Sequence, residues 1–76
     1  MSPVAIIEQY TERAARAWDK HCLDKALWRG MGAAHALHAV GLLSDAEQGN
    51  TLSRLVDVCA MRTTELAAES GQGGAQ

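Results

Sequence analysis

Three side chains near the middle of the chain have the chemistry of metal ligands. His35 and His38 stand three residues apart, a spacing that puts both imidazoles on one side of a helix, and Glu47 follows after a turn. Recognised helical zinc sites carry a fuller signature such as H-E-x-x-H, which this sequence lacks. We therefore interpret the two histidines as solvated or hydrogen-bonded side chains, and we predict no metal and no cofactor.

A second chemical group is the neighbouring pair His21 and Cys22, because an imidazole can activate a thiol for nucleophilic attack. Adjacent positions of a helix point about 100° apart, so these two side chains do not face each other. Cys22 also falls on an apolar stripe, where ionisation of a thiol is disfavoured. The other cysteine is Cys59, and neither belongs to a C-x-x-C motif. We predict two reduced core thiols and no enzymatic activity.

Basic residues gather in the first half of the chain, where they could form a phosphate-binding strip. They are Arg13, Arg16, Lys20, Lys25 and Arg29. Three carboxylates, those of Glu12, Asp19 and Asp24, interrupt this strip. Glu12 is also placed to pair with Arg16 at i,i+4. The formal net charge of −2 opposes a dedicated nucleic-acid binder, which normally carries a basic excess. Nucleic-acid binding through the five residues is therefore the alternative function.

The chain has 76 residues, enough for one small domain with a marginal core. It is rich in alanine and leucine, contains no phenylalanine, and carries its single proline at position 3, where proline suits the first turn of a helix. These features predict an all-α fold. No apolar run approaches the ~18 residues needed to span a bilayer, and no signal peptide precedes the helical pattern. We expect a cytoplasmic protein with no membrane contact.

The first helical segment is predicted to extend to about Val40. Ser2 can cap a helix that starts at Pro3, and no later proline interrupts the helical periodicity. Gly41 is the natural end of this segment, because glycine readily adopts the left-handed conformation that often follows a helix.

A second helix is predicted to start at Asp45. Ser44 and Glu47 have the spacing of a capping box, in which each side chain accepts a hydrogen bond from the other residue's amide. The predicted core stripe of this helix consists of Leu52, Leu55, Val56, Cys59, Thr63 and Leu66. Because the connection is short, residues 1–69 are predicted to form an antiparallel helical hairpin, followed by a flexible tail over residues 70–76.

The apolar stripe of the first segment changes sides near residue 22. Up to that point, one face carries Val4, Ile7, Tyr10, Ala14, Trp18 and Cys22. Beyond it, a face rotated by about 160° carries Leu23, Ala26, Leu27, Gly30, Ala34 and Leu37. Two structures accommodate this change. Either the chain bends within residues 19–24 and forms three helices that close on themselves, or one helix of about 38 residues meets different neighbours along its length.

One chain of this size can bury little core alone, which favours dimerisation, and the sequence leaves the bend near residue 22 undecided. If the first helix is unbroken, the second helix covers only its C-terminal part and leaves its N-terminal stripe open to water. An exposed stripe of that size normally marks an interface, so we predict a homodimer that forms a four-helix bundle, with a compact three-helix monomer as the alternative. The predicted interface residues are Ile7, Tyr10, Ala14, Trp18, Trp28 and Met31.

Two glycines inside the first segment also need a reason. Gly30 and Gly32 each cost about 1 kcal/mol relative to alanine in a helix. Together with nearby alanines they form a small-residue patch, which favours a close crossing with the second helix. A kink and an intermolecular contact are the alternatives.

Residues 36–47, Ala-Leu-His-Ala-Val-Gly-Leu-Leu-Ser-Asp-Ala-Glu, resemble the hairpin junction of many small all-α accessory proteins encoded by bacterial plasmids, integrative elements and phages. The resemblance implies a protein that acts by binding another macromolecule: a regulator, a stability or transfer accessory factor, or an inhibitor of a host defence complex of the anti-CRISPR kind. It assigns no functional residue. The leading hypothesis is a non-enzymatic, homodimeric module that docks on an unidentified protein partner. A small transcriptional or nucleic-acid-binding regulator is the alternative.

Overall fold

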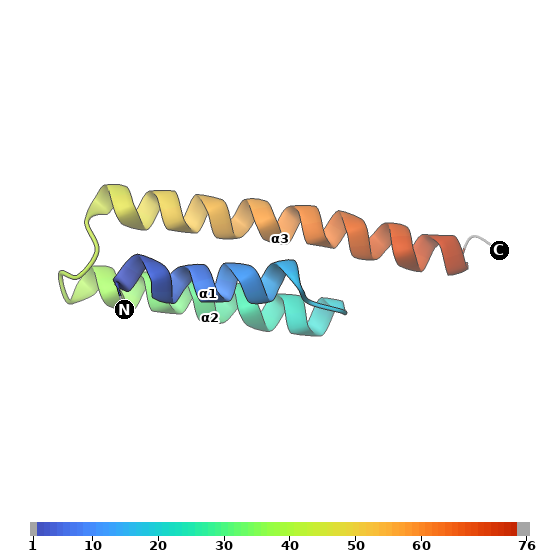
Figure 1. Cartoon of the computed structure of the whole chain (residues 1–76), viewed down its shortest axis with the longest axis horizontal. Coiled ribbons are helices and arrows are strands. Elements are labelled where there is room, and N and C mark those ends of the chain that lie inside the picture. Colours follow the sequence, from blue (N-terminus) through green and yellow to red (C-terminus); the bar gives the residue numbers. More distant parts are fainter. Residues whose placement is uncertain (1, 75–76) are drawn as a thin grey trace.

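The computed structural model is a bundle of three helices joined by two short connections (Figure 1). Helix α1 spans Pro3–Ala15, α2 spans Lys20–Ala39 and α3 spans Asp45–Gly74. The structure describes the backbone of residues 2–74 and the side chains of residues 2–69. Each helix packs against both of the others, and α2 runs antiparallel to α1 and to α3. The predicted all-α fold is confirmed, and within the described residues there is no strand.

The bend near residue 22, which the sequence leaves undecided, is present as a break between Ala15 and Lys20, so the first segment is not one long helix. Asp19 accounts for the break. Its backbone is extended, and its carboxylate accepts a hydrogen bond from the amide of Cys22 at 2.8 Å, which makes it the N-cap of α2. The change of sides in the apolar stripe therefore marks a junction between two helices, as the three-helix alternative requires.

The break lets α1 fold back into the groove that α2 and α3 form. Ile7 and Ala14 of α1 are fully buried there, together with Leu23 of α2 and Leu55 of α3. We expected the α1 stripe to stay open to water for a second chain, and this expectation is wrong for Ile7 and Ala14. Helices α2 and α3 of the same chain cover this stripe, because α1 can fold back against them once it is no longer collinear with α2.

The turn between α2 and α3 is built as the sequence indicates. Gly41 has a φ of +80°, its amide donates to the carbonyl of His38 at 3.0 Å, and the next amide donates to the carbonyl of Leu37 at 2.9 Å. This pair of hydrogen bonds is a Schellman motif. Ser44 and Glu47 exchange the two hydrogen bonds of a capping box, at 3.0 and 3.1 Å. The predicted end of the first segment at Gly41 and the predicted start of the next helix at Asp45 are both confirmed.

The helices approach one another closely at Gly30. A Cβ atom at this position would lie 2.6 Å from Cδ2 of Leu55 and 3.1 Å from Cβ of Tyr10, distances at which side chains clash. The predicted close crossing is therefore confirmed at Gly30. It does not explain Gly32, because a Cβ there would meet no atom within 4 Å.

Helix α3 differs from its prediction in two ways. Leu55 and Cys59 of the predicted core stripe are buried, but Thr63 is exposed and Val56 is 50% exposed. The stripe is narrower than predicted, because the facing helices contact only one side of α3. The backbone of α3 also stays helical to Gly74, through most of the predicted tail, and Figure 1 shows that it extends past the α1–α2 connection. Residues 75–76 of that tail lie outside the described residues.

Candidate functional site

The six predicted interface residues do not form one surface. Ile7 and Ala14 are buried within the chain, and Tyr10 and Met31 are half-buried. Trp18 and Trp28 are the exceptions, with 76% and 69% of their surface exposed. The fold thus leaves the two tryptophans as the exposed members of the predicted set, and they lie at different places on the bundle.

An open cleft of about 210 Å³ lies between α1 and α2. It is lined by Tyr10, Arg13, Cys22, Lys25, Ala26 and Arg29. Three of the five predicted basic residues therefore meet at one place, because the antiparallel packing of α1 on α2 brings Arg13 beside Lys25 and Arg29. Of the other two, Arg16 is exposed at the end of α1, and Lys20 is bound in an ion pair.

The carboxylates that were expected to interrupt the basic strip are engaged elsewhere or stand apart. Asp19 caps α2, and its hydrogen bonds from Cys22 lower the pKa of its carboxyl group. Asp24 pairs with Lys20 at 2.8 Å. Glu12 is exposed and, among the described side chains, forms no ion pair with Arg16, so that predicted pair is absent.

The positive charge of the cleft is uncompensated. Within residues 2–69, no carboxylate forms an ion pair with Arg13, Lys25 or Arg29. The guanidinium of Arg13 instead stands 5.2 Å from the ring centre of Tyr10, in a cation–π contact. Lys25 and Arg29 are one helical turn apart, a like-charge arrangement that costs about 0.2–0.5 kcal/mol. The cleft is therefore attractive to an anionic group.

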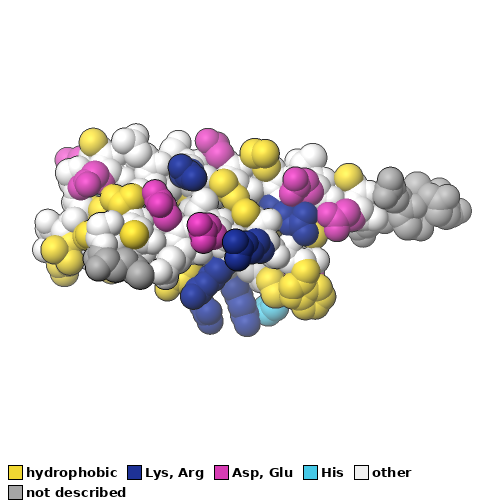
Figure 2. Space-filling model, viewed as in Figure 1, with side chains coloured by type: hydrophobic (Ala, Val, Ile, Leu, Met, Phe, Trp, Pro, Cys, Tyr) yellow, Lys and Arg dark blue, Asp and Glu magenta, His cyan; other side chains and the backbone are white. Residues whose placement is uncertain are grey.

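Trp28 extends this surface along the solvent side of α2. It is one turn from Lys25 and one turn before the unobstructed Gly32, and it stands outside the lining of the cleft itself. Figure 2 shows Lys and Arg side chains projecting together from the lower edge of the view, while Asp and Glu side chains lie mainly above them. We call the surface formed by Tyr10, Arg13, Lys25, Trp28 and Arg29 the α1–α2 face. Tryptophan, tyrosine and arginine are the side chains most often responsible for binding energy at protein interfaces.

Trp18 belongs to a separate groove of about 570 Å³ at the end of the bundle where α3 extends past the other helices. Its lining residues are Trp18, Asp19, Lys20, Thr63, Leu66, Ala67 and Glu69. This groove is wide and open, and its walls come from the α1–α2 connection and from α3.

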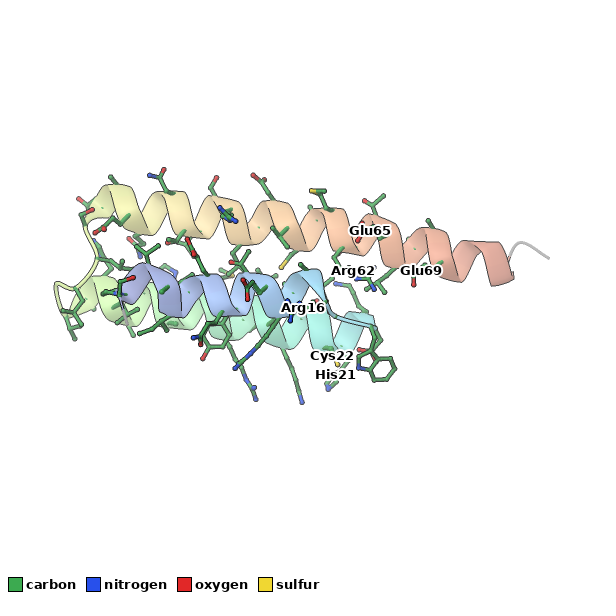
Figure 3. All side chains as sticks on the ribbon, viewed as in Figure 1. Arg16, His21, Cys22, Arg62, Glu65 and Glu69 are labelled. Carbon is green, nitrogen blue, oxygen red and sulfur yellow. The ribbon has the colours of Figure 1, made fainter. Side chains whose placement is uncertain are left out.

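Arg62 secures this end of the bundle, and sequence reasoning missed it. Its Nε donates to the carbonyl of Ala17 at 2.7 Å, and its Nη1 lies 3.3 Å from a carboxylate oxygen of Glu65 and 3.1 Å from one of Glu69. Figure 3 shows the three charged side chains together on α3, beside the α1–α2 connection. No local signal could reveal the contact, because 45 residues separate Arg62 from Ala17.

The two histidines that were weighed as metal ligands bond to other partners. His38 pairs with Asp45, and the side-chain Nε2 of Gln48 donates to Nδ1 of His35 at 3.0 Å. Glu47 is held in the capping box and does not join the histidines. Among the described residues, no three His, Cys, Asp or Glu side chains are placed to hold a metal ion.

Both cysteines are free thiols with raised pKa values. Hydrogen bonding to the carboxylate of Asp19 and then burial raise the pKa of Cys22, and burial raises the pKa of Cys59. Cys59 is a core residue as predicted, whereas Cys22 is half-buried. The thiols stay protonated near neutral pH and are weak nucleophiles. No hydrogen bond joins Cys22 to His21 among the described side chains.

None of the helices, over the residues described, combines the length and the apolar character needed to cross a membrane. Comparisons of the chain with protein-family models, with curated proteins and with solved structures find no match. Among the exposed surfaces of the bundle, the α1–α2 face is the best defined in geometry and charge.

Proposed function

We propose that this protein is a non-enzymatic helical binding module that docks on a protein partner through the α1–α2 face. The observation that carries the proposal is Trp28, a large aromatic side chain held 69% exposed near the middle of a 20-residue helix. Exposed tryptophan on a preformed helix suits binding, because its contact area can be buried with little loss of conformational freedom.

The surroundings of Trp28 support this function. Tyr10, Arg13 and Arg29 lie on the same face, so the residue types that dominate interface energetics are concentrated there. Gly32 leaves open space one turn beyond Trp28, where a partner can approach the α2 backbone closely. The exposed side chains of this face, those of Arg13, Trp28 and Arg29, contribute little to the core that holds the bundle together.

The biological setting is a further part of the proposal. The likeness of residues 36–47 to hairpin junctions in accessory proteins of bacterial mobile elements supports an accessory or inhibitor role in the cytoplasm of a bacterium. In such a role the module would act by occupying a surface of its partner. A bound helical face can block that surface to other molecules, or join two proteins, without catalysing a reaction.

The test is affinity capture with the purified chain on a support and bacterial lysate as the source of partners. We expect the Trp28→Ala chain to lose proteins that the unaltered chain retains, by more than about tenfold, as for a binding hot spot. Met61→Ala is the control, since it removes a similarly exposed apolar side chain from another helix. Equal retention by both variants, with their helical content unchanged by circular dichroism, would contradict the α1–α2 face as the docking site.

We also propose that the chain forms a homodimer, now through the groove at Trp18 rather than through the buried α1 stripe. The support is that Trp18 stands 76% exposed beside Leu66 and Ala67 of α3. Sedimentation over micromolar concentrations should show a dimer that Trp18→Glu converts to monomer. A strict monomer at all concentrations would rule this part out.

Nucleic-acid binding is the second candidate function, and one observation favours it. Asp19 and Asp24, which interrupt the basic strip in the sequence, are engaged in a cap and an ion pair, so Arg13, Lys25 and Arg29 face the cleft unneutralised. Fluorescence anisotropy with labelled DNA and RNA at low salt tests this candidate. Undetectable binding at low salt excludes it, because phosphate contacts are strongest there.

A further inference from the structure

The packing of the three helices gives no reason for the positive charge of the cleft between α1 and α2. The formal net charge of the chain is −2, yet Arg13, Lys25 and Arg29 meet in one cleft with no carboxylate paired to them within residues 2–69. Like charges one turn apart on a helix repel, so folding alone gains nothing from placing Lys25 and Arg29 together. An anionic partner removes this repulsion.

The shape of the cleft favours a helix as that partner. α1 and α2 lie side by side and antiparallel, and the space between them is floored by Tyr10, Cys22 and Ala26. A further helix placed in such a groove packs its side chains between those of two neighbours, as in a four-helix bundle. The described residues contain no strand, so pairing with a strand of the partner at a sheet edge is not available.

We infer that the α1–α2 cleft receives an acidic amphipathic helix of a partner protein, which completes a four-helix arrangement. Apolar side chains of that helix rest on Tyr10 and Ala26. Carboxylates spaced i,i+4 match Lys25 and Arg29, which have the same spacing on α2, and Arg13 contacts a carboxylate from the α1 side. The inference rests on the proposed function, because it names the chemistry of the partner that the α1–α2 face binds.

A second copy of this chain fits the cleft poorly. Helix α3 exposes the apolar Val56 and Met61, but the carboxylate of Glu65 nearby is held by Arg62 at 3.3 Å, and Asp57 is the acidic residue left beside them. Self-association through the cleft is therefore an outcome to be tested and not the expected one.

Helix α1 carries exposed Glu8 and Glu12 at the required spacing. None of the large exposed apolar side chains of the described residues adjoins them, so this helix also lacks the amphipathic character of the proposed partner.

The test uses two synthetic helical peptides of about 18 residues with the same leucine and alanine stripe, long enough to span α1. One carries glutamate pairs at i,i+4 beside the stripe, and the other carries glutamine at those positions. We expect the glutamate peptide to bind the full chain at least about tenfold more tightly than the glutamine peptide, and to lose affinity between about 20 and 200 mM salt.

Variants of the chain test whether the glutamate peptide binds in the cleft. Lys25→Gln combined with Arg29→Gln should weaken binding of the glutamate peptide at least about tenfold. Lys20→Gln is the matched control, because Lys20 is an exposed cation on the same helix that pairs with Asp24 outside the cleft. Equal binding of both peptides, no binding of either, or equal loss with Lys20→Gln would overturn the inference.

Other occupants give distinct results. Tighter binding of a single-stranded DNA of equal charge than of the glutamate peptide would replace the helix with nucleic acid. A dimer in sedimentation that dissociates in the Lys25→Gln, Arg29→Gln chain would make a second copy the occupant. Either result overturns the inference. If lysate proteins are lost with Trp28→Ala but retained by the Lys25→Gln, Arg29→Gln chain, the proposed function stands and the acidic helix is wrong.

Discussion

Gly30 and Gly32 lie two residues apart on α2 and face opposite surroundings. Gly30 is pressed between Leu55 of α3 and Tyr10 of α1, so that a methyl group would clash, whereas Gly32 faces open space. The inner side of α2 is thus constrained by packing of the whole bundle. The outer side, which carries Trp28, Lys25 and Arg29, is free of that constraint and is available for binding.

The strongest test of this contrast is to remove a side chain of α3 that packs against the inner side of α2. Leu55 is fully buried in the core and lies against Gly30. Leu55→Ala should lower the free energy of unfolding by about 2–5 kcal/mol, because it removes buried contacts and leaves a cavity. Urea unfolding followed by circular dichroism measures the change.

Met61 provides the control on the same helix, since it is exposed. Met61→Ala should change the free energy of unfolding by no more than about 0.5 kcal/mol. Similar losses for Leu55→Ala and Met61→Ala would show that the inner and outer sides are not distinguished by packing.

The two glycines give the next largest effect, with opposite signs. Gly30→Ala should destabilise the bundle by about 1–3 kcal/mol, because Tyr10 and Leu55 must move to admit the new methyl group. Gly32→Ala should stabilise it by about 0.5–1 kcal/mol, because alanine favours the helix and meets no atom. Thermal and urea unfolding of both variants measures the difference, and the same sign for both would contradict the close crossing.

Arg62 tests how α3 holds the connection between α1 and α2. Its side chain is only 17% exposed, and its Nε bonds to the carbonyl of Ala17. Arg62→Met should cost about 1–2 kcal/mol of stability, because it removes a charged hydrogen bond while keeping the apolar stem. Arg54→Met is the control, since Arg54 is exposed and has no such bond. Equal unfolding midpoints in urea would show that the Ala17 contact is dispensable.

The smallest effect concerns pH and the cap of α2. The pKa of Asp19 is lowered, chiefly by the hydrogen bond from the Cys22 amide, so its stabilising contribution is present above its ordinary pKa and is lost as pH falls through the lowered folded value. Asp19→Asn should keep the cap but reduce the loss of stability below about pH 4. Thermal unfolding at pH 7 and at pH 3 measures this, with the exposed Asp57→Asn as control. An unchanged acid response in Asp19→Asn would remove Asp19 from the explanation.

The candidate site was predictable in part. Trp28 and the five basic residues were named from the sequence as candidate contact residues, and three of those basic residues do line one cleft. The sequence could not show that Asp19 and Asp24 are engaged elsewhere, because a cap and an ion pair depend on where α2 begins. It also placed Ile7 and Ala14 at an interface between chains, when a single chain buries both.

The sequence by itself determined the helical fold, the start of α1, the end of α2 and the start of α3. The cap at Ser2, the left-handed Gly41 and the capping box of Ser44 and Glu47 all form as predicted, because each depends on hydrogen bonds between residues close in the chain. Tertiary structure alone decided which helix covers which face. That choice depends on three helices packing at once, through contacts as remote in sequence as Arg62 with Ala17.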